Sequence, residues 1–166
     1  TQAQSSATSN LPHKDSVKNS LWKSGSVAII YPEESEFLNE YLAWAEGVKQ
    51  NSRYLTISIF GDKSVPDSIL NDSPLLIVGT QENNQLLEKW LPSTPISPTR
   101  NGFMFQGMEY EEENQSVFLS WYPHPANPSI PMSILTGNSD QAIIAMMGPS
   151  SRRNGMGIGF GNWDYQ

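Results

Sequence analysis

Two segments of the sequence combine an apolar run, a glycine and small polar residues, a pattern that suits the binding of a polar or anionic ligand. One reads Val-Gly-Thr-Gln-Glu-Asn over residues 78–83, and the other reads Leu-Thr-Gly-Asn-Ser-Asp over residues 135–140. Glycine allows the backbone to approach a ligand closely, and the free N–H groups where a helix begins attract anions. The candidate ligand-binding residues of these segments are Gly79, Thr80, Asn83, Gly137, Asn138 and Ser139.

A purely structural role is the favoured alternative for both segments, because Thr80, Asn138 and Ser139 are also good helix-capping residues. Neither segment matches the GxGxxG pattern of dinucleotide-binding proteins or a phosphate-binding P-loop. If both helices begin at the carboxyl ends of adjacent strands, their N–H groups converge on one shared site. No cofactor is predicted from either segment.

Histidine chemistry depends on His124, because the other histidine, His13, lies in the polar opening of the chain. His124 stands between Pro123 and Pro125 in a predicted loop, and we include it among the candidate ligand-binding residues. A surface or packing role is favoured there. A single histidine cannot form a two-histidine metal site, so no metal is predicted, and no GxSxG turn presents a serine nucleophile.

The strongest acidic cluster combines Glu109 with the run Glu111–Glu113. Paired carboxylates can hydrolyse glycosidic bonds or hold calcium, but calcium loops interleave Asp, Asn and Gly at a set spacing that is absent here. We favour a solvated hairpin arm. A hydrolase that uses His124 or the Glu109–Glu113 cluster is kept as the enzyme alternative, although no recognisable catalytic constellation is present.

Composition restricts the classes of chemistry and partner. The chain has 166 residues, enough for one domain, and a formal net charge of −7. Nucleic acid is not an expected partner, because phosphate binding needs clustered lysine and arginine. The absence of cysteine excludes disulfides, thiol nucleophiles and cysteine-ligated zinc. No apolar run approaches the ~18 residues that a membrane span requires.

The opening residues TQAQSSATSN are small and polar. Such a stretch is typical of the mature start of an exported protein or of a lipoprotein stalk. We therefore expect an exported chain, which is periplasmic, extracellular or lipoprotein-anchored. Residues 1–23 lack apolar periodicity and are predicted to be a flexible lead-in, followed by a single domain over residues 24–166.

The first half of that domain alternates buried strands with amphipathic helices. Continuous apolar runs predict strands over residues 26–31, 54–60 and 75–78. Apolar residues at helical spacing predict two helices, the first opening on a run of glutamates after Pro32 and the second spanning residues 82–91. A strand–helix–strand unit of this length predicts a parallel pair with a right-handed crossover.

The second half favours antiparallel structure. A small hairpin is expected to turn near Gln106-Gly107. Strands over residues 117–122 and 132–135 flank a proline-rich bend too short for a parallel crossover, so we expect antiparallel neighbours. Residues 136–140 open a third helix that runs to about Met147. Phe160–Gln166 is expected either to add one edge strand or to belong to something further downstream.

The predicted fold class is therefore α/β. We expect a three-layer sandwich of flavodoxin-like or Rossmann-like type, with a mixed, mainly parallel sheet and a β-hairpin insertion.

Three segments carry a resemblance to a known kind of module. They are VGTQENN at residues 78–84, YPHPANP at residues 122–128 and GNS at residues 137–139. In this order they resemble a poorly characterised α/β module of secreted bacterial proteins, which occurs as an accessory segment attached to secreted peptidases and esterases. Its members typically read VGTxxxN, a glycine-turned hairpin, YPNPxNP and GNS. His124 replaces the usual Asn, so any binding at that position has altered chemistry.

The resemblance covers about residues 74–140 and supplies no catalytic assignment. It implies a non-catalytic accessory domain, binding or structural, of an exported bacterial protein, with a fused or associated secreted hydrolase as partner. The alternatives are the hydrolase described above and a protein-interaction module that uses the hairpin and the open edge of the sheet.

Overall fold

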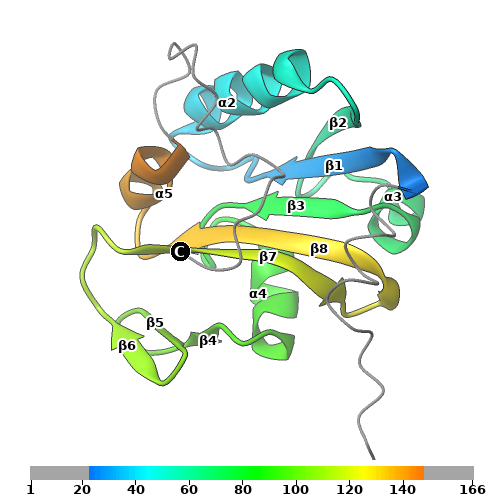
Figure 1. The fold of residues 1–166 in the computed structure, drawn as a ribbon. Coiled ribbons are helices and arrows are strands. Elements are labelled where there is room, and N and C mark those ends of the chain that lie inside the picture. The colour runs from blue at the N-terminus through cyan, green and yellow to red at the C-terminus, as the bar shows by residue number, and fades with distance from the viewer. Residues whose placement is uncertain (1–22, 148–166) are drawn as a thin grey trace, which may run out of the picture.

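The computed structural model describes residues 23–147, which form an α/β fold with two sheets (Figure 1). The larger sheet has the strand order β2-β1-β3-β8-β7, and a separate small sheet has the order β4-β5-β6. The expected α/β class and the mixed, mostly parallel sheet are confirmed. The predicted lead-in up to residue 22 and the possible strand Phe160–Gln166 lie outside the described residues.

The larger sheet begins with a βαβ unit. Strands β1 (Ser26–Tyr31) and β2 (Thr56–Gly61) are parallel and pair without a register shift, and α2 (Leu38–Asn51) connects them. The parallel pair predicted from the sequence is confirmed. Helix α2 begins after the glutamate run instead of within it, because turns at residues 33–37 intervene.

Strand β3 (Leu75–Val78) is the centre of the larger sheet. It lies between β1 and β8 and is parallel to both. All four of its residues are apolar and at most 2% exposed. A strand covered on both faces needs apolar side chains on both, which explains its continuous apolar run. Short helix α3 (Asp67–Asp72) precedes β3, and α4 (Gln85–Trp90) with the 3₁₀ turn η1 (Leu91–Ser93) follows it.

Strands β7 (Ser116–His124) and β8 (Asn127–Gly137) form a long antiparallel pair, as expected. Both strands extend into the proline-rich segment that the sequence predicted to be a bend, so that only Pro125 and Ala126 separate them. The pairing shifts register between Leu119 and Tyr122 and again before His124. The edge position of β7 explains this, because prolines and bulges are tolerated where a strand has one neighbour.

The small sheet contains β4 (Ser97–Pro98), β5 (Phe103–Phe105) and β6 (Met108–Tyr110). Strands β5 and β6 are joined by Gln106 and Gly107, whose φ angles are 53° and 79°. Two consecutive positive φ values define the tight turn that matches the twist of a two-residue hairpin. The predicted turn at these residues is confirmed.

Two hydrophobic clusters fill the space on either face of the larger sheet. One includes side chains of α2 and of α5 (Asp140–Met147), and the other includes side chains of α4 and the small sheet. Figure 1 shows α2 and α5 on one side of the sheet and α4 with β4–β6 on the other. Packing from both faces fixes the strand ends, and therefore the loops that leave them. Within residues 23–147, no helix has the length and apolar character needed to cross a membrane.

Candidate functional site

The two glycine-containing segments meet at one edge of the sheet. Gly79 follows β3 and Gly137 ends β8, and these strands are adjacent and parallel. The N–H of Gly79 donates to the carbonyl of Leu135 at 3.2 Å. The structure therefore brings six predicted residues together at the carboxyl edge of the sheet: Gly79, Thr80, Asn83, Gly137, Asn138 and Ser139.

The first loop is held by a reciprocal pair of hydrogen bonds. The N–H of Thr80 donates to Oδ1 of Asn83 at 2.8 Å, and the N–H of Asn83 donates to Oγ1 of Thr80 at 3.2 Å. Gly79 has a φ of 133°, and a Cβ at this position would lie 2.9 Å from Oδ1 of Asn83. Glycine is thus required here by the loop itself, and Thr80 and Asn83 satisfy each other.

Asn84 is a structurally important position in this loop that the sequence reasoning missed. Its side chain is fully buried, accepts from the N–H of Leu86 at 3.0 Å and donates to the carbonyl of Val78 at 2.9 Å. Asn84, and not Thr80, is therefore the residue that caps α4. The signal for it was present, because Asn84 is the last residue of the VGTxxxN pattern.

Residues of the second loop form hydrogen bonds with the end of β6 and the segment that follows it. Nδ2 of Asn138 donates to the carbonyls of Tyr110 at 3.0 Å and Glu112 at 2.8 Å, and its N–H donates to the carbonyl of Gln115 at 3.0 Å. Ser139 donates to the carbonyl of Glu113 at 2.7 Å and accepts from the N–H of Ala142. Asn138 thus acts as a clamp, because it bonds the segment around residues 110–115 to the end of β8. Ser139 caps α5.

Asp140 joins the two loops. Nδ2 of Asn83 donates to Oδ1 of Asp140 at 2.8 Å, and the buried hydroxyl of Tyr41 on α2 donates to the same oxygen at 2.5 Å. Burial, followed by this hydrogen bond to Asp140, raises the pKa of Tyr41 far above its ordinary value, so the phenol stays protonated. Asp140 and Tyr41 are further positions that the sequence reasoning did not single out.

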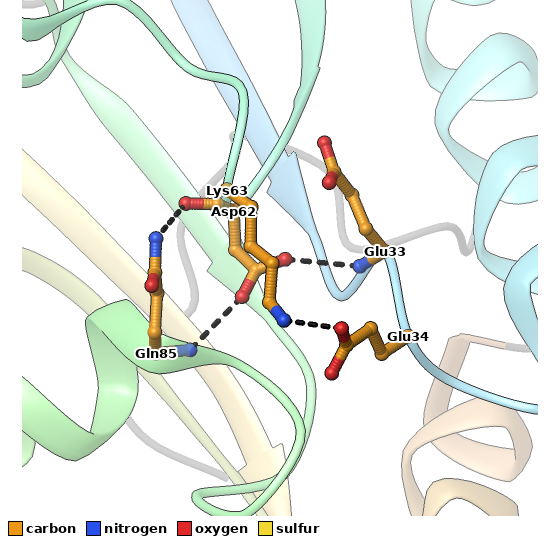
Figure 2. A network of polar contacts seen from close by, with 5 residues as sticks. All are labelled: Glu33, Glu34, Asp62, Lys63 and Gln85. Carbon is orange, nitrogen blue, oxygen red and sulfur yellow. Dashed lines mark hydrogen bonds and ion pairs between the residues drawn. The ribbon is translucent and has the colours of Figure 1, made fainter.

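A second polar network lies beside these loops, where β2 ends (Figure 2). Its centre is Asp62, which is 1% exposed. Oδ1 of Asp62 accepts from the N–H of Glu33 and Oδ2 accepts from the N–H of Gln85, each at 3.0 Å. Nε2 of Gln85 also donates to the carbonyl of Asp62 at 2.5 Å. One buried carboxylate therefore connects the loop after β1 to the first residue of α4.

The rim of this network is exposed and charged. Lys63 forms an ion pair with Glu34 (Figure 2), and both side chains are exposed. The hydroxyl of Ser64 donates to the carboxylate of Glu33. These outer contacts are screened by water and contribute little to stability compared with the buried carboxylate. The only sequence signal for Asp62 was its place two residues after a predicted strand, next to Gly61.

The position of these groups matters because ligands of open α/β sheets bind where neighbouring loops leave in opposite directions. The loop after β1 leads to α2 on one face, and the loop after β3 leads to α4 on the other. Between them, Cγ of Pro32 would lie 3.2 Å from a Cβ placed on Gly79. Asp62 accepts from an N–H of each side. One N–H group on each side of this place is therefore already bonded to a side chain of the protein itself.

His124 does not belong to this edge. It is the last residue of β7, and through the β7–β8 turn it lies at the opposite end of β8 from Gly137. A strand of this length separates the two ends by on the order of 30 Å. His124 was expected in a loop, whereas it is a strand residue with no exposed surface. It therefore cannot share a site with the other six candidates.

The glutamate cluster is also separate from His124. Glu109 and Glu111–Glu113 are exposed, and the carbonyls of Glu112 and Glu113 bond to Asn138 and Ser139 near the carboxyl edge. The two parts of the hydrolase alternative thus lie at opposite ends of β8. Among residues 23–147, no group of three His, Cys, Asp or Glu side chains is placed to hold a metal ion.

Comparison with known proteins adds no relative, since no family model, no curated protein and no solved structure matches the chain. The assignment of a role therefore depends on the geometry described above and on the sequence pattern.

Proposed function

We propose that this chain is a non-catalytic accessory domain of an exported bacterial protein, and that its carboxyl-edge network has a structural role. The observation that carries the proposal is the buried carboxylate of Asp62, which accepts from the N–H groups of Glu33 and Gln85. In a ligand-binding α/β domain, N–H groups at this place are left for the ligand. Here an internal anion takes them.

The neighbouring loops support the same proposal. The N–H groups of Thr80, Asn138 and Ala142 are bonded to groups of the protein itself. The side chains of Asn83 and Asp140 bond to each other across the two loops. A shared ligand site at the two loops would have to break these contacts, and this favours the capping role over the binding role.

The finer fold assignment and the cellular context belong to the same proposal. We take the domain as a flavodoxin-like or Rossmann-like three-layer sandwich, because the described part of the sheet carries helices on both faces. Export, and attachment to a secreted peptidase or esterase, are proposed from the VGTxxxN, YPxPxNP and GNS pattern. Such a domain would support the folding or placement of its neighbour without acting on substrate.

Activity measurements test the proposal directly. The full chain is assayed with ester, peptide and glycoside model substrates, beside a secreted hydrolase as positive control. We expect no turnover above that of buffer, since His124 is buried and the exposed glutamates lie far from it. Turnover that disappears in His124→Ala or in Glu111→Gln would overturn the proposal in favour of the hydrolase alternative.

The accessory role has its own test in the full-length gene product. If a hydrolase domain is attached, deletion of this domain should reduce the yield of folded protein and the melting temperature. The catalytic constant per folded molecule should stay within about twofold. A selective loss of catalytic rate in correctly folded protein would instead assign this domain a part in the reaction.

A further inference from the structure

His124 is a buried histidine whose role is not explained by the carboxyl-edge network. It has no exposed surface and lies beside the turn between β7 and β8, where Pro125 and Ala126 separate the strands. Its ring packs edge-on against Trp90 of α4, with 4.6 Å between the ring centroids. Next to it, Nδ2 of Asn127 donates to the carbonyl of Asn71 on α3 at 3.1 Å. The turn is therefore held between two helices.

The hydrogen bonds of His124 define its protonation state. Nδ1 accepts from the N–H of Ala126 at 2.9 Å, so in the neutral ring the proton lies on Nε2. Nε2 is buried and has no hydrogen-bond partner among the described residues. The backbone of Leu70 on α3 acts to raise the pKa of His124, but its effect is smaller than that of burial. The bond from Ala126 closes the turn, and it exists only while Nδ1 carries no proton.

Among the described residues, the surroundings of His124 provide no negative charge to balance an imidazolium. Apart from His124, the segment from Ser116 to Gly137 contains no titratable side chain except Tyr122. The charged residues of the helices packed against it are exposed: Asp67 and Asp72 on α3, and Glu88 and Lys89 on α4. Burial is the main cause that lowers the pKa of His124 below its ordinary value.

We propose that His124 is an acid-sensitive latch that holds the β7–β8 turn against α3 and α4. Protonation of Nδ1 places a donor opposite the N–H of Ala126, which abolishes the bond that closes the turn. It also places a positive charge in a fully buried site that has no carboxylate partner within residues 23–147. The turn is then released from Trp90 and from α3, and the released end of the sheet becomes accessible in an acidic surrounding. The latch is independent of the accessory role proposed above.

The direction in which pH changes the stability of the protein follows from the burial of the neutral His124 ring. Because folding disfavours the protonated form, the unfolded chain binds the extra proton more readily. The contribution of His124 to stability is complete above about pH 6.5, the ordinary pKa of histidine. It is lost as the pH falls from there through the lower pKa of the folded protein.

The test compares the full natural chain with His124→Asn, because Oδ1 of Asn can accept from the N–H of Ala126 and cannot take up a proton. Urea unfolding is measured between pH 8 and pH 5. Relative to the variant, we expect the unfolding constant of the natural chain to increase towards about tenfold per pH unit below pH 6.5. His13→Gln is the matched control, and its curve should parallel that of the natural chain. Parallel curves for the natural chain and His124→Asn would overturn the latch.

A direct titration keeps the proposal testable if His124→Asn does not fold. The chain has two histidines, so their ring signals can be assigned in NMR spectra with His13→Gln. We expect the signal of His124 to titrate below pH 6.5, with the amide signal of Ala126 shifting or broadening at the same midpoint. Titration of His124 at or above pH 6.5, or an unchanged Ala126 signal through its midpoint, would show that no latch exists.

Discussion

At the scale of the residue, the buried polar side chains of this protein act as hydrogen-bond partners for its own backbone. Asp62 accepts from two N–H groups that lie 29 and 23 residues away along the chain. Asn84 links the end of β3 to the start of α4. A donor that loses its partner inside the protein lowers the free energy of unfolding by more than an average hydrogen bond contributes. Removal of either side chain should therefore destabilise the fold.

Asp62→Ala provides the first quantitative test. Two part-buried N–H groups lose a charged acceptor, and we expect the free energy of unfolding to fall by ~2–4 kcal/mol. Urea unfolding of the full chain measures this change. Asp72→Ala, which removes an exposed carboxylate at the end of α3, is the control and should change stability by less than ~0.5 kcal/mol.

The same variant shows whether Asp62 occupies the position of a ligand. Formate carries the carboxylate that Asp62→Ala lacks and is small enough for the space that the side chain leaves. Added formate should therefore raise the melting temperature of Asp62→Ala more than that of the natural chain. Equal shifts for the two proteins would show that this place does not accept an anion.

At the scale of the element, Asn138 couples the small sheet to the larger one. Its amide donates to carbonyls at the end of β6 and just after it, while its backbone continues from β8 towards α5. Strand β6 ends at Tyr110 and is paired only along one side within the small sheet. The hairpin thus depends on this clamp, and on the packing of Phe103 and Phe105, for its position.

Replacing Asn138 with Ala should loosen the hairpin selectively. We expect the free energy of unfolding to fall by ~0.5–1.5 kcal/mol, because the part-buried carbonyl of Tyr110 and the exposed carbonyl of Glu112 lose their donor. Amide hydrogen exchange should become faster in β5 and β6 than in β3, and this local effect distinguishes the clamp from general destabilisation. Asn114→Ala, an exposed position before β7, is the control that should leave exchange unchanged.

At the scale of the whole molecule, stability is centred on β3. Strands β1 and β8 flank it, and a hydrophobic cluster covers each of its faces. A strand in this position can exchange its amide protons only when both clusters are disrupted, so its opening should equal global unfolding.

Ile77→Ala tests that centre. Ile77 is fully buried, and its truncation should lower the free energy of unfolding by ~2–5 kcal/mol through the cavity that remains. The free energy of opening that hydrogen exchange reports at residues 75–78 should fall by the same amount. Met108→Ala, at a side chain that is 61% exposed, should have little effect on either measurement. Fast exchange in β3 of the natural chain would contradict a central strand.

The sequence by itself determined the features that depend on neighbouring residues. The apolar run at residues 75–78 identified a strand buried on both faces, and Gln106-Gly107 identified a hairpin turn, because both reflect local burial and backbone preference. For Gly79 and Gly137 the sequence indicated only that each follows a strand, and the parallel pairing of β3 with β8 decided that they share one edge. The start of α2 and the ends of β7 and β8 were less well predicted. Turn residues and prolines at these places fit more than one local structure, and contacts with other parts of the chain decide which one forms.

Only the tertiary structure decided which donor each polar side chain meets. Asp62 receives its role from Glu33 and Gln85, which the strand order β2-β1-β3 brings to it from distant parts of the chain. His124 looked like a loop residue between prolines and became a buried strand residue because α3 and α4 cover the β7–β8 turn. Local sequence encodes the propensity to bury or to turn, whereas the partner of a buried polar group depends on contacts across the whole fold.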